Sequence, residues 1–543
     1  MANKVGELFK QGRYEELWQR CCGFIDLSLG DFMKIQQRLL EEQLELLKRC
    51  ELGHYIMNGA DPFTMEEFRE RVPLTTYDDY AHYLLEKRED ALPEKPTLWQ
   101  YTSGKSGEYP FRWAPVTAEQ LNEIEPLIFT LLFFSSCKRR NEIVFNEHDK
   151  ALYGMAPPPY ATGTMARVFP YKLFDFLPPV DEAEKMSFEE RIQRGFELAL
   201  SDGLDVCLTM SSVAVAIGNR FRQKSSKTNI KTLLKRPKAI PRLARGLIKS
   251  KLAHRPLLPK DLWSLKGLIT FGIDSAVFKE KIKEAWGREP LEFHGCTEAV
   301  MIATQTWDHQ GMTFIPHLNF FEFIPEEESI RSREDPAYQP STLLLDEVKP
   351  GKYELVITSF HGGPFVRYRL GHLIEITSLR NEQLNIAIPQ MVFLSRVDDQ
   401  IDIAGFTRLS EKIIWQAIEN TGLAYEDWTI RKELNGEPRL HLYIELKENG
   451  YVSAEQVAAS VNEELKKLDI PYAELESFTG LKPLTVTLLS PNVFQLYKQR
   501  QQASGADLAQ MKPPHINPGS DTIDFLVDAA SREVVEARQK IKV

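Results

Sequence analysis

The first stretch that could do chemistry is the loop TSGKSG, which combines glycine and hydroxyl residues around a lysine. Glycine lets backbone N–H groups approach a phosphate closely, hydroxyl groups add hydrogen-bond donors, and lysine adds positive charge. The spacing differs from the GxxxxGK[ST] pattern of a Walker loop. Ser/Gly turns also occur without any ligand, so phosphate binding and a plain polar turn both stay open. The candidate phosphate ligands are Thr102, Ser103, Gly104, Lys105, Ser106 and Gly107.

Three further stretches carry candidate residues. HGCTE, His294–Glu298, follows a short apolar segment. A carboxylate such as that of Glu298, at the mouth of a sheet, can hold a Mg²⁺ ion that bridges nucleotide phosphates, whereas the alternative for any single glutamate is a surface acid. The other two stretches are RYRLGH, Arg367–His372, and SRVDDQIDIAGFTRLSEKI, Ser395–Ile413. None of them decides a function by itself.

The order of the four stretches says more than any one of them. A Ser/Thr/Gly loop, then Y-G-x-T-E, Y-R-x-G-D and R-x-D-D-Q-x-x-x-x-G, is the motif order of adenylate-forming, acyl-activating enzymes. Within that superfamily the sequence resembles the Gretchen Hagen family of acyl acid–amido synthetases over residues 30–515. Five stretches carry the resemblance: FRERVPLTTYDDY, TSGKSG with RWAPVT, NFFEFIP, YELVITSFHGGPFVRYRLGH and YKQRQQASGADLAQMKPPH.

The resemblance implies a reaction in two halves, with ATP and Mg²⁺ as cofactors. A carboxylic acid attacks the α-phosphate of ATP to give an acyl-adenylate and pyrophosphate, and an amine or amino acid then displaces AMP. In the first half, the loop 102–107 would hold phosphate, and Ser103 would also act in catalysis. Cys296 and Thr297 would lie beside the adenine and the α-phosphate, and Glu298 would bind Mg²⁺.

The resemblance also implies roles for residues late in the chain. Arg396 would contact ribose or phosphate, and Asp398 would be the pivot about which a small domain rotates. Lys512, in QMKPPH, would stabilise negative charge during adenylation. Such charge gathers on oxygen atoms in the transition state, where fixed N–H groups, a metal ion and a lysine stabilise it.

Three positions depart from the family pattern. Lys105 stands where the family has Thr or Ser, and His372 stands where it has an Asp that holds both ribose hydroxyls. Arg408, at the start of a K-x-x-E-like stretch that ends at Glu411, replaces a lysine and keeps the charge with a different geometry. Loss of the ribose carboxylate would weaken ATP affinity by roughly 10- to 150-fold. A neutral histidine can still accept one hydrogen bond.

Three functions therefore stay open. The leading interpretation is an ATP-dependent acid–amido synthetase. The stretch from Ser395 is closer to general acyl-CoA ligases, so an acyl-CoA or acyl-carrier-protein ligase is an alternative. Lys105 and His372 together favour a third reading, a catalytically weakened nucleotide-binding homologue.

The elements that must position these motifs alternate between helix and strand. Residues 31–50 predict an amphipathic helix from their apolar spacing. A short helix, a break at Pro73 and a second helix capped by Thr76 follow, and a strand at Leu98–Tyr101 leads into the first motif. Alternating strands and helices after Leu265 predict an α/β fold with a large multi-sheet N-terminal adenylating domain and a smaller, mobile α+β C-terminal domain.

Domain bounds follow from this pattern and from length. The 543 residues are too many for one ordinary core. We expect a large domain over residues 1–397, a small cap domain over 398–518 and one appended helix over 519–543. A hairpin turn is expected at Gly405.

Composition limits the function classes. The chain is 43% hydrophobic and 27% charged with a net charge of −10, which predicts a globular protein and argues against general nucleic-acid binding. It has no apolar run long enough to span a membrane, and its N-terminal residues lack the apolar core of a signal peptide. Six cysteines without CxxC spacing indicate reduced thiols and a cytoplasmic location. Cys21 and Cys22 are expected to pack within a helix.

Two segments have open roles. The segment Arg220–Lys260 contains thirteen Lys and Arg residues from Arg222 to Lys260 and no acidic residue. This charge predicts a solvated helical hairpin or a docking surface for an acidic carrier protein or anionic cofactor. Asp205–Phe221 is an apolar strand and helix. It would be ordinary core or line an acyl pocket, with Ser211 or Ser212 near a carboxylate.

Overall fold

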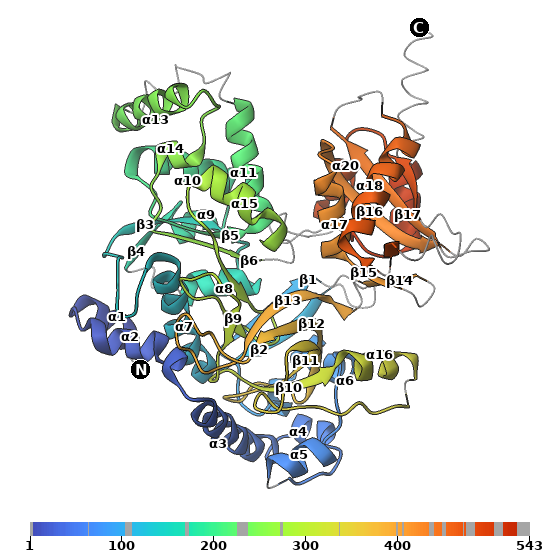
Figure 1. Cartoon of the computed structure of the whole chain (residues 1–543). Helices are drawn as coiled ribbons and strands as arrows, with labels where there is room; N and C mark the ends of the chain where they lie inside the picture. Colours follow the sequence, from blue (N-terminus) through green and yellow to red (C-terminus); the bar gives the residue numbers. More distant parts are fainter. Residues whose placement is uncertain are drawn as a thin grey trace. The chain divides into compact units, whose positions relative to one another are not determined.

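The computed structural model forms two compact units, Met1–Phe393 (unit 1) and Leu394–Val543 (unit 2). Figure 1 shows both units, coloured along the chain. The predicted boundary residue Asp398 lies outside the described residues. The structure describes residues 4–62, 64–103, 111–168, 173–224, 237–271, 275–335, 337–397, 400–403, 407–433, 439–447, 452–470, 472–473, 484–503 and 514–528.

Unit 1 is built on an 11-stranded sheet of order β10-β11-β12-β13-β9-β8-β7-β6-β5-β3-β4. The half from β7 to β4 is parallel, and the other half is antiparallel. The parallel strands are β3 (Asp149–Gly154), β4 (Phe174–Leu177), β5 (Val206–Met210), β6 (Gly267–Phe271) and β7 (Leu291–His294). The rest are β8 (Ala303–Thr304), β9 (Met312–Phe314), β10 (Asn319–Pro325), β11 (Gly351–Ser359), β12 (Tyr368–Ser378) and β13 (Gln390–Arg396).

Helices cover the parallel half on both faces, which explains why runs such as VCLTM and GLITF are mostly apolar and almost wholly buried. α7 (Ala118–Ser136) packs on β6 and β7, while α10 (Phe188–Asp202) and α11 (Ser211–Lys224) pack on β3–β6 from the opposite side in Figure 1. A capping box of Thr117 and Gln120 starts α7. The remaining helices here are α8 (Ala161–Val168), α9 (Val180–Ala183), α13 (Ile240–Leu252), α14 (Pro259–Leu262) and α15 (Ser275–Trp286).

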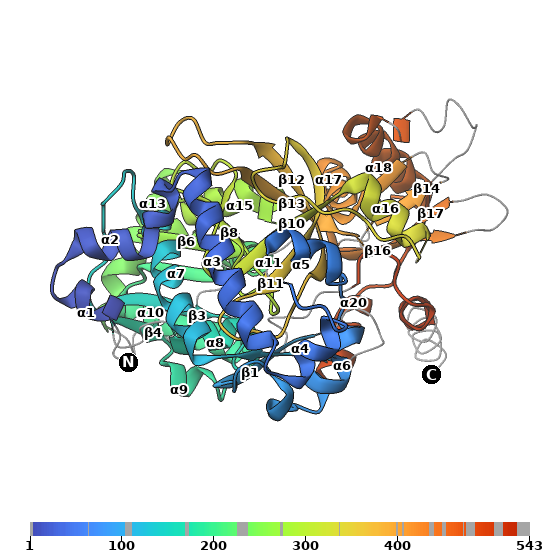
Figure 2. The same ribbon diagram turned by 90° about the horizontal axis from the view of Figure 1, so that it is seen from below.

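Among the N-terminal helices, α3 (Leu29–Leu47) contacts β10 of the antiparallel half, whereas α2 (Tyr14–Cys22) packs on α7. Figure 2 shows these helices from below. The helix predicted over 31–50 is α3 (Leu29–Leu47), whose buried Gln36 donates to the carbonyl oxygens of Pro316 and Asn319 at 2.7 and 2.8 Å. The others are α1 (Lys4–Lys10), α2 (Tyr14–Cys22), α4 (Glu51–Ile56), α5 (Met65–Arg71), α6 (Asp78–Leu85) and, later in the chain, α16 (Glu326–Glu334). Cys21 and Cys22 are buried in α2, as expected.

The predicted cap at Thr76 is wrong. Helix α6 begins at Asp78 without a side-chain cap, and Tyr77 precedes it. The carboxylate of Asp79 instead accepts from the Thr76 backbone N–H at 2.7 Å. The Thr76 hydroxyl also donates to this carboxylate, at 3.4 Å, so it does not accept an N–H of the first helical turn as a cap would.

Unit 2 is an α+β domain. Strands β16 (Tyr425–Glu433), β17 (Arg439–Leu446) and β18 (Leu484–Leu488) form one sheet, and β14 (Gln400–Ile403) pairs antiparallel with β15 (Thr407–Ser410). The turn predicted at Gly405 lies outside the described residues. Helices α17 (Glu411–Asn420), α18 (Ala454–Leu468) and α20 (Val493–Ala503) accompany these strands. Residues 520–528 are helical, and Ile523 and Leu526 pack with α20 residues. The predicted α/β class with a smaller α+β domain is confirmed.

Candidate active site

The first motif lies at the end of strand β1 (Leu98–Ser103), which pairs with β2 (Phe111–Val116) in a separate two-stranded ribbon. Thr102 and Ser103 are opposite Arg112 and Phe111 in this ribbon. The Tyr101 ring anchors it through contacts with the rings of Phe111, Trp113 and Tyr160, at centroid distances of 4.5 to 4.9 Å. Gly104, Lys105, Ser106 and Gly107 lie outside the described residues.

The second motif forms a tight turn directly after β7. The Val300 N–H donates to the Cys296 carbonyl at 2.7 Å, and the Ile302 N–H donates to the His294 carbonyl at 2.9 Å. A Cβ atom at Gly295 would lie 2.2 Å from the Val300 carbonyl oxygen. Glycine is therefore required at position 295, because any side chain would force this turn open.

A buried hydrogen bond joins the first motif to the second. The Nε2 atom of Gln100, in β1, donates to the carbonyl oxygen of Thr297 at 2.8 Å. Both residues are buried. The ribbon that carries Thr102 and Ser103 is thus held against the HGCTE turn.

The third motif joins them through Tyr368, the first residue of β12. Burial raises the pKa of this phenol far above its ordinary value, and the negative charge of Glu298 raises it further. The charge of Arg112, from the β1–β2 ribbon, acts in the opposite direction, and a thiolate at Cys296 would raise the pKa as well. Tyr368 consequently stays protonated, and its pKa responds to charges from three separate motifs.

His372, four residues further along β12, contacts the second motif directly. Its Nδ1 lies 3.1 Å from Nε2 of His294, and both rings are buried. The His294 ring stacks on Phe393 at a centroid distance of 4.7 Å. A hydrogen bond between two ring nitrogens needs one N–H and one bare nitrogen, so the pair cannot hold this bond with both rings protonated. The structure thus links His372, the departure from the family pattern, to His294.

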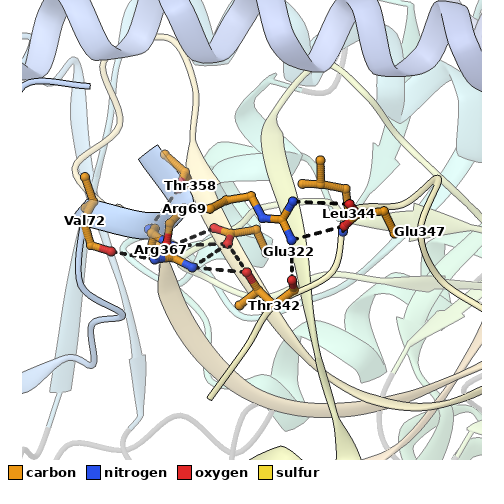
Figure 3. Close-up of polar contacts among 8 residues, drawn as sticks. All are labelled: Arg69, Val72, Glu322, Thr342, Leu344, Glu347, Thr358 and Arg367. Atoms are coloured by element: carbon orange, nitrogen blue, oxygen red, sulfur yellow. Dashed lines mark hydrogen bonds and ion pairs between the residues drawn. The ribbon is translucent and has the colours of Figure 1, made fainter. Parts of the chain in front are cut away.

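A buried ionic network fixes the start of β12 (Figure 3). The Arg367 guanidinium donates to Glu322 of β10 at 2.7 Å and to the Arg69 and Val72 carbonyl oxygens at 2.5 Å each. The Arg367 backbone has φ of +43°, and its N–H donates to Thr358 at 2.9 Å. Figure 3 shows these groups converging on the guanidinium. Arg367 therefore sets the position of Tyr368 and His372 without belonging to the group around Tyr368.

The remaining predicted residues lie in unit 2 or outside the described residues. Arg396 is the half-buried last residue of β13. Arg408 lies in β15 opposite Asp402, and its side chain is not among those described. Asp398 and Lys512 are outside the described residues. Their roles stay predictions.

Unit 2 contains a buried charged cluster that the motifs alone did not indicate. His515 Nδ1 lies 2.6 Å from Glu411, and its Nε2 lies 2.9 Å from Asp427. Burial alone would lower the pKa of His515, but hydrogen bonds and charges from these two carboxylates outweigh it and raise the pKa to about 9. Trp428 stacks on the imidazole at 4.3 Å. His515 is therefore an imidazolium at neutral pH.

This cluster ties together the two sequence stretches that carry Arg408 and Lys512. Glu411 follows Arg408 by three positions, and His515 follows Lys512 by three. The chain at 514–517 also pairs with β16, because Ile430 N–H donates to the His515 carbonyl at 2.7 Å and Asn517 N–H donates to that of Ile430 at 2.9 Å. The signal in the sequence was a histidine beside the late lysine motif and a glutamate beside the hinge motif.

The two segments with open roles are partly defined. Ser211 is buried, and its hydroxyl donates to the Phe271 carbonyl at 3.5 Å, while the Ser212 side chain is not described. In the basic segment, Arg220 pairs with Glu189 and Arg222 with Glu284. These two arginines therefore form ion pairs within unit 1.

One hollow of about 800 Å³ lies at the β4 edge of the sheet, lined by charged residues of both signs such as Lys150, Asp175 and Arg194. None of the predicted site residues lines it. The hydrogen bonds Gln100–Thr297 and His294–His372 connect the sequence motifs directly, so the candidate site lies at these motifs and not at the edge hollow. Among the described residues, no helix is both long and apolar enough to cross a bilayer.

Two solved structures share the fold of this chain. An acyl acid amido synthetase, AtGH3.15, solved with 2,4-DB, superposes with a TM-score of 0.65 at 17% identity, covering 94% of this chain and 95% of that one. A 2-hydroxyisobutyryl-CoA ligase in its postadenylation state superposes with a TM-score of 0.62 at 13% identity, covering 95% and 94%. At these identities the likeness establishes the fold.

The family follows from the sequence matches. The chain matches the N-terminal domain of the GH3 family over residues 22–157, its central domain over 312–396 and its C-terminal domain over 411–519. These matches together cover more than half of the chain, and the protein belongs to the GH3 family, the Gretchen Hagen family of the sequence motifs. A probable indole-3-acetic acid-amido synthetase, GH3.11 of Oryza sativa subsp. japonica, is 25% identical over 229 residues, which are 39% of this chain and 38% of that relative.

Proposed function

We propose that this protein is an ATP-dependent acid–amido synthetase, which adenylates a carboxylic acid and couples the acyl group to an amine or amino acid. The observation that carries the proposal is the meeting of three family motifs in unit 1. Gln100 joins the first motif to the second, and His372 joins the third to the second. Membership of the GH3 family supports the same activity.

Within this proposal the residues of unit 1 bind and orient the nucleotide. Backbone N–H groups of the loop 102–107, with the hydroxyls of Thr102, Ser103 and Ser106 and the charge of Lys105, would hold the pyrophosphate end. Cys296 and Thr297 would lie beside the adenine and α-phosphate, and His372 would face the ribose. Tyr368 stays protonated within this proposal, because burial and the charge of Glu298 both raise the pKa of its phenol.

Mg²⁺ fits the donor set at Glu298. The described residues contain no group of three or more His, Cys, Asp or Glu side chains that could hold a metal. Mg²⁺ bound to nucleotide needs no such group, because it commonly uses one or two carboxylates together with phosphate oxygens and water. The half-buried Glu298 carboxylate is the residue that would hold the ion, which would neutralise charge on the phosphates.

Residues of unit 2 would complete the reaction. We assign Lys512 to charge stabilisation during adenylation, Arg408 to a supporting cationic role and Arg396 to the ribose or phosphate. The described anchor of the Lys512 stretch is the pairing of residues 514–517 with β16. This anchor begins two residues after Lys512.

Pyrophosphate release from ATP tests the adenylation half. We expect release that requires a carboxylic acid and Mg²⁺, and at least a tenfold loss in Glu298→Gln and in Ser103→Ala, the scale of removing one charge-stabilising group. Glu147→Gln, at an exposed glutamate outside the motifs, is the matched control and should keep the wild-type rate. Absence of release across a broad panel of acids would favour the weakened nucleotide-binding homologue and refute the proposal.

The acceptor test separates the amide from the thioester. The enzyme is given one active acid, ATP and Mg²⁺ with a mixture of amino acids, with CoA or with an acyl carrier protein, and the products are weighed by mass spectrometry. We expect an amide. A thioester with CoA or the carrier protein would contradict the amidation half of the proposal while leaving adenylation intact.

A further inference from the structure

Helix α13 (Ile240–Leu252) exposes an unusual apolar stripe. Its inner face is closely packed, since a Cβ atom at Gly246 would lie 2.6 Å from Leu262 of α14. Its outer face follows helical spacing at 240, 244, 247, 248 and 252. The large side chains of this stripe are exposed as follows: Ile240 44%, Leu247 42%, Ile248 59% and Leu252 76%.

Basic residues accompany the stripe. Arg245 and Lys249 border it, and Lys251 lies within it; all three are exposed and have no ion-pair partner in the described part of the chain. By contrast, Arg242 donates to the Ala199 carbonyl at 3.0 Å and Arg255 pairs with Asp261 at 2.7 Å. Arg245, Lys249 and Lys251, on the outer face of α13, can therefore contact a partner, whereas Arg242 and Arg255 are engaged within unit 1.

The helix is also free of acidic residues, although the whole chain has a net charge of −10. In Figure 1 α13 lies at the outer end of unit 1, beyond α14 and α10. Its 13 residues measure about 20 Å, too short to cross a bilayer but suited to lying in its surface.

We propose that α13 docks unit 1 on an anionic lipid surface, with the apolar stripe entering the headgroup boundary. Helices that lie in a membrane surface carry an apolar face bordered by Lys and Arg, and each such cation adds attraction to acidic lipids. Ile248 and Leu252, at 59% and 76%, are the most exposed large side chains of the stripe, so apolar surface dominates this face and favours a lipid surface over an acidic protein. A second copy of this chain would bring Arg245, Lys249 and Lys251 against their own equivalents, which is repulsive.

Vesicle flotation of the full chain tests the proposal. The probes are vesicles of phosphatidylcholine alone and of phosphatidylcholine with 30% phosphatidylglycerol, a composition of about the acidity that attracts basic helices. We expect the protein to float with the anionic vesicles, to detach as NaCl is raised and to stay behind with the neutral ones. Ile248→Glu/Leu252→Glu should lower the partition coefficient at least about 100-fold, because two apolar side chains are lost and two repelled charges are added.

Two further variants keep the result interpretable. Leu379→Glu/Ile470→Glu makes the same chemical change at side chains that are 46% and 72% exposed elsewhere, and it should float like the wild type. Arg245→Gln/Lys249→Gln/Lys251→Gln should lower anionic binding roughly 100-fold and remove its salt dependence. If the variant Ile248→Glu/Leu252→Glu (the stripe variant) unfolds at the same temperature as the wild type, it is folded, and its loss of flotation reports lipid binding.

Three results would overturn the proposal. They are no flotation of the wild type with anionic vesicles, equal flotation of the stripe variant and the Leu379/Ile470 control, and self-association of the wild type in sedimentation that the stripe variant lacks. The last result would assign the stripe to a second copy of the chain. Salt-sensitive binding of an acyl carrier protein without lipid binding would assign it to an acidic protein instead.

Discussion

Replacing His515 by glutamine should change the pH dependence of unit 2 stability in a defined window. His515 is only 3% exposed and bridges Glu411 and Asp427, and its pKa is raised from 6.5 to about 9. A raised pKa means that the imidazolium stabilises the fold fully below pH 6.5 and that this contribution is lost as the pH rises to about 9. The shift corresponds to about 3 kcal/mol, because one pKa unit is worth about 1.4 kcal/mol.

The lowered pKa of Asp427 follows from the same cluster. Burial would raise the pKa of this carboxyl, but the hydrogen bond and charge of His515 and the charge of Lys498 lower it overall. Its stabilising contribution is therefore present above its unfolded pKa and is lost on acidification. The two signs together predict greatest stability of the cluster between the acidic titration of Asp427 and pH 6.5.

Hydrogen exchange measured by mass spectrometry gives the local readout. Peptides that cover Ile430 and residues 514–517 report the backbone pairing beside His515. After correction for intrinsic exchange, the wild type should lose about 3 kcal/mol of protection between pH 6.5 and 9. His515→Gln should start lower and show little change over that range.

The exposed His82, in α6 of unit 1, provides the matched control, and His82→Gln should behave like the wild type. A wild-type protection profile that is flat from pH 6.5 to 9 would refute the argument. So would a profile that falls equally in His515→Gln.

Three more predictions concern unit 1. Arg367→Met should lower the free energy of unfolding by about 3–5 kcal/mol in urea titrations, since it leaves the buried Glu322 charge alone, whereas Arg13→Met at an exposed pair should change it by less than about 1 kcal/mol. Gly295→Ala should abolish pyrophosphate release with the helical circular dichroism retained, because its Cβ would meet the Val300 carbonyl; normal release would disprove the tight turn. His372→Asp should tighten ATP binding in calorimetry by roughly 10- to 150-fold, and unchanged affinity would show that position 372 does not face the ribose.

Much of the fold could be predicted because local pattern and tertiary role agree. The strands β5 and β6 are mostly apolar and almost wholly buried, since helices cover both faces of the parallel sheet. The residues around the start of α6 predict a hydroxyl cap at Thr76, but in the structure both the backbone N–H and the hydroxyl of Thr76 donate to Asp79. Residue types alone do not give the direction of this contact.

The motifs located the candidate site in the sequence, but not its internal contacts. Gln100 and Thr297 are 197 positions apart, and His294 and His372 are 78 apart. Such pairs depend on strand order in the sheet, which no local spacing encodes. The His515 cluster escaped notice for the same reason, since its partner Glu411 is 104 positions away.

The transfer of oxygen from acid to AMP tests the central claim most directly. A carboxylic acid that is a substrate is labelled with ¹⁸O in its carboxylate and incubated with the enzyme, ATP, Mg²⁺ and an amino acid. If the carboxylate attacks the α-phosphate and the amine then displaces AMP, one labelled oxygen must remain on the AMP, which becomes heavier by two mass units. Unlabelled AMP, or product formation with release of ADP and labelled phosphate, would contradict the adenylation mechanism.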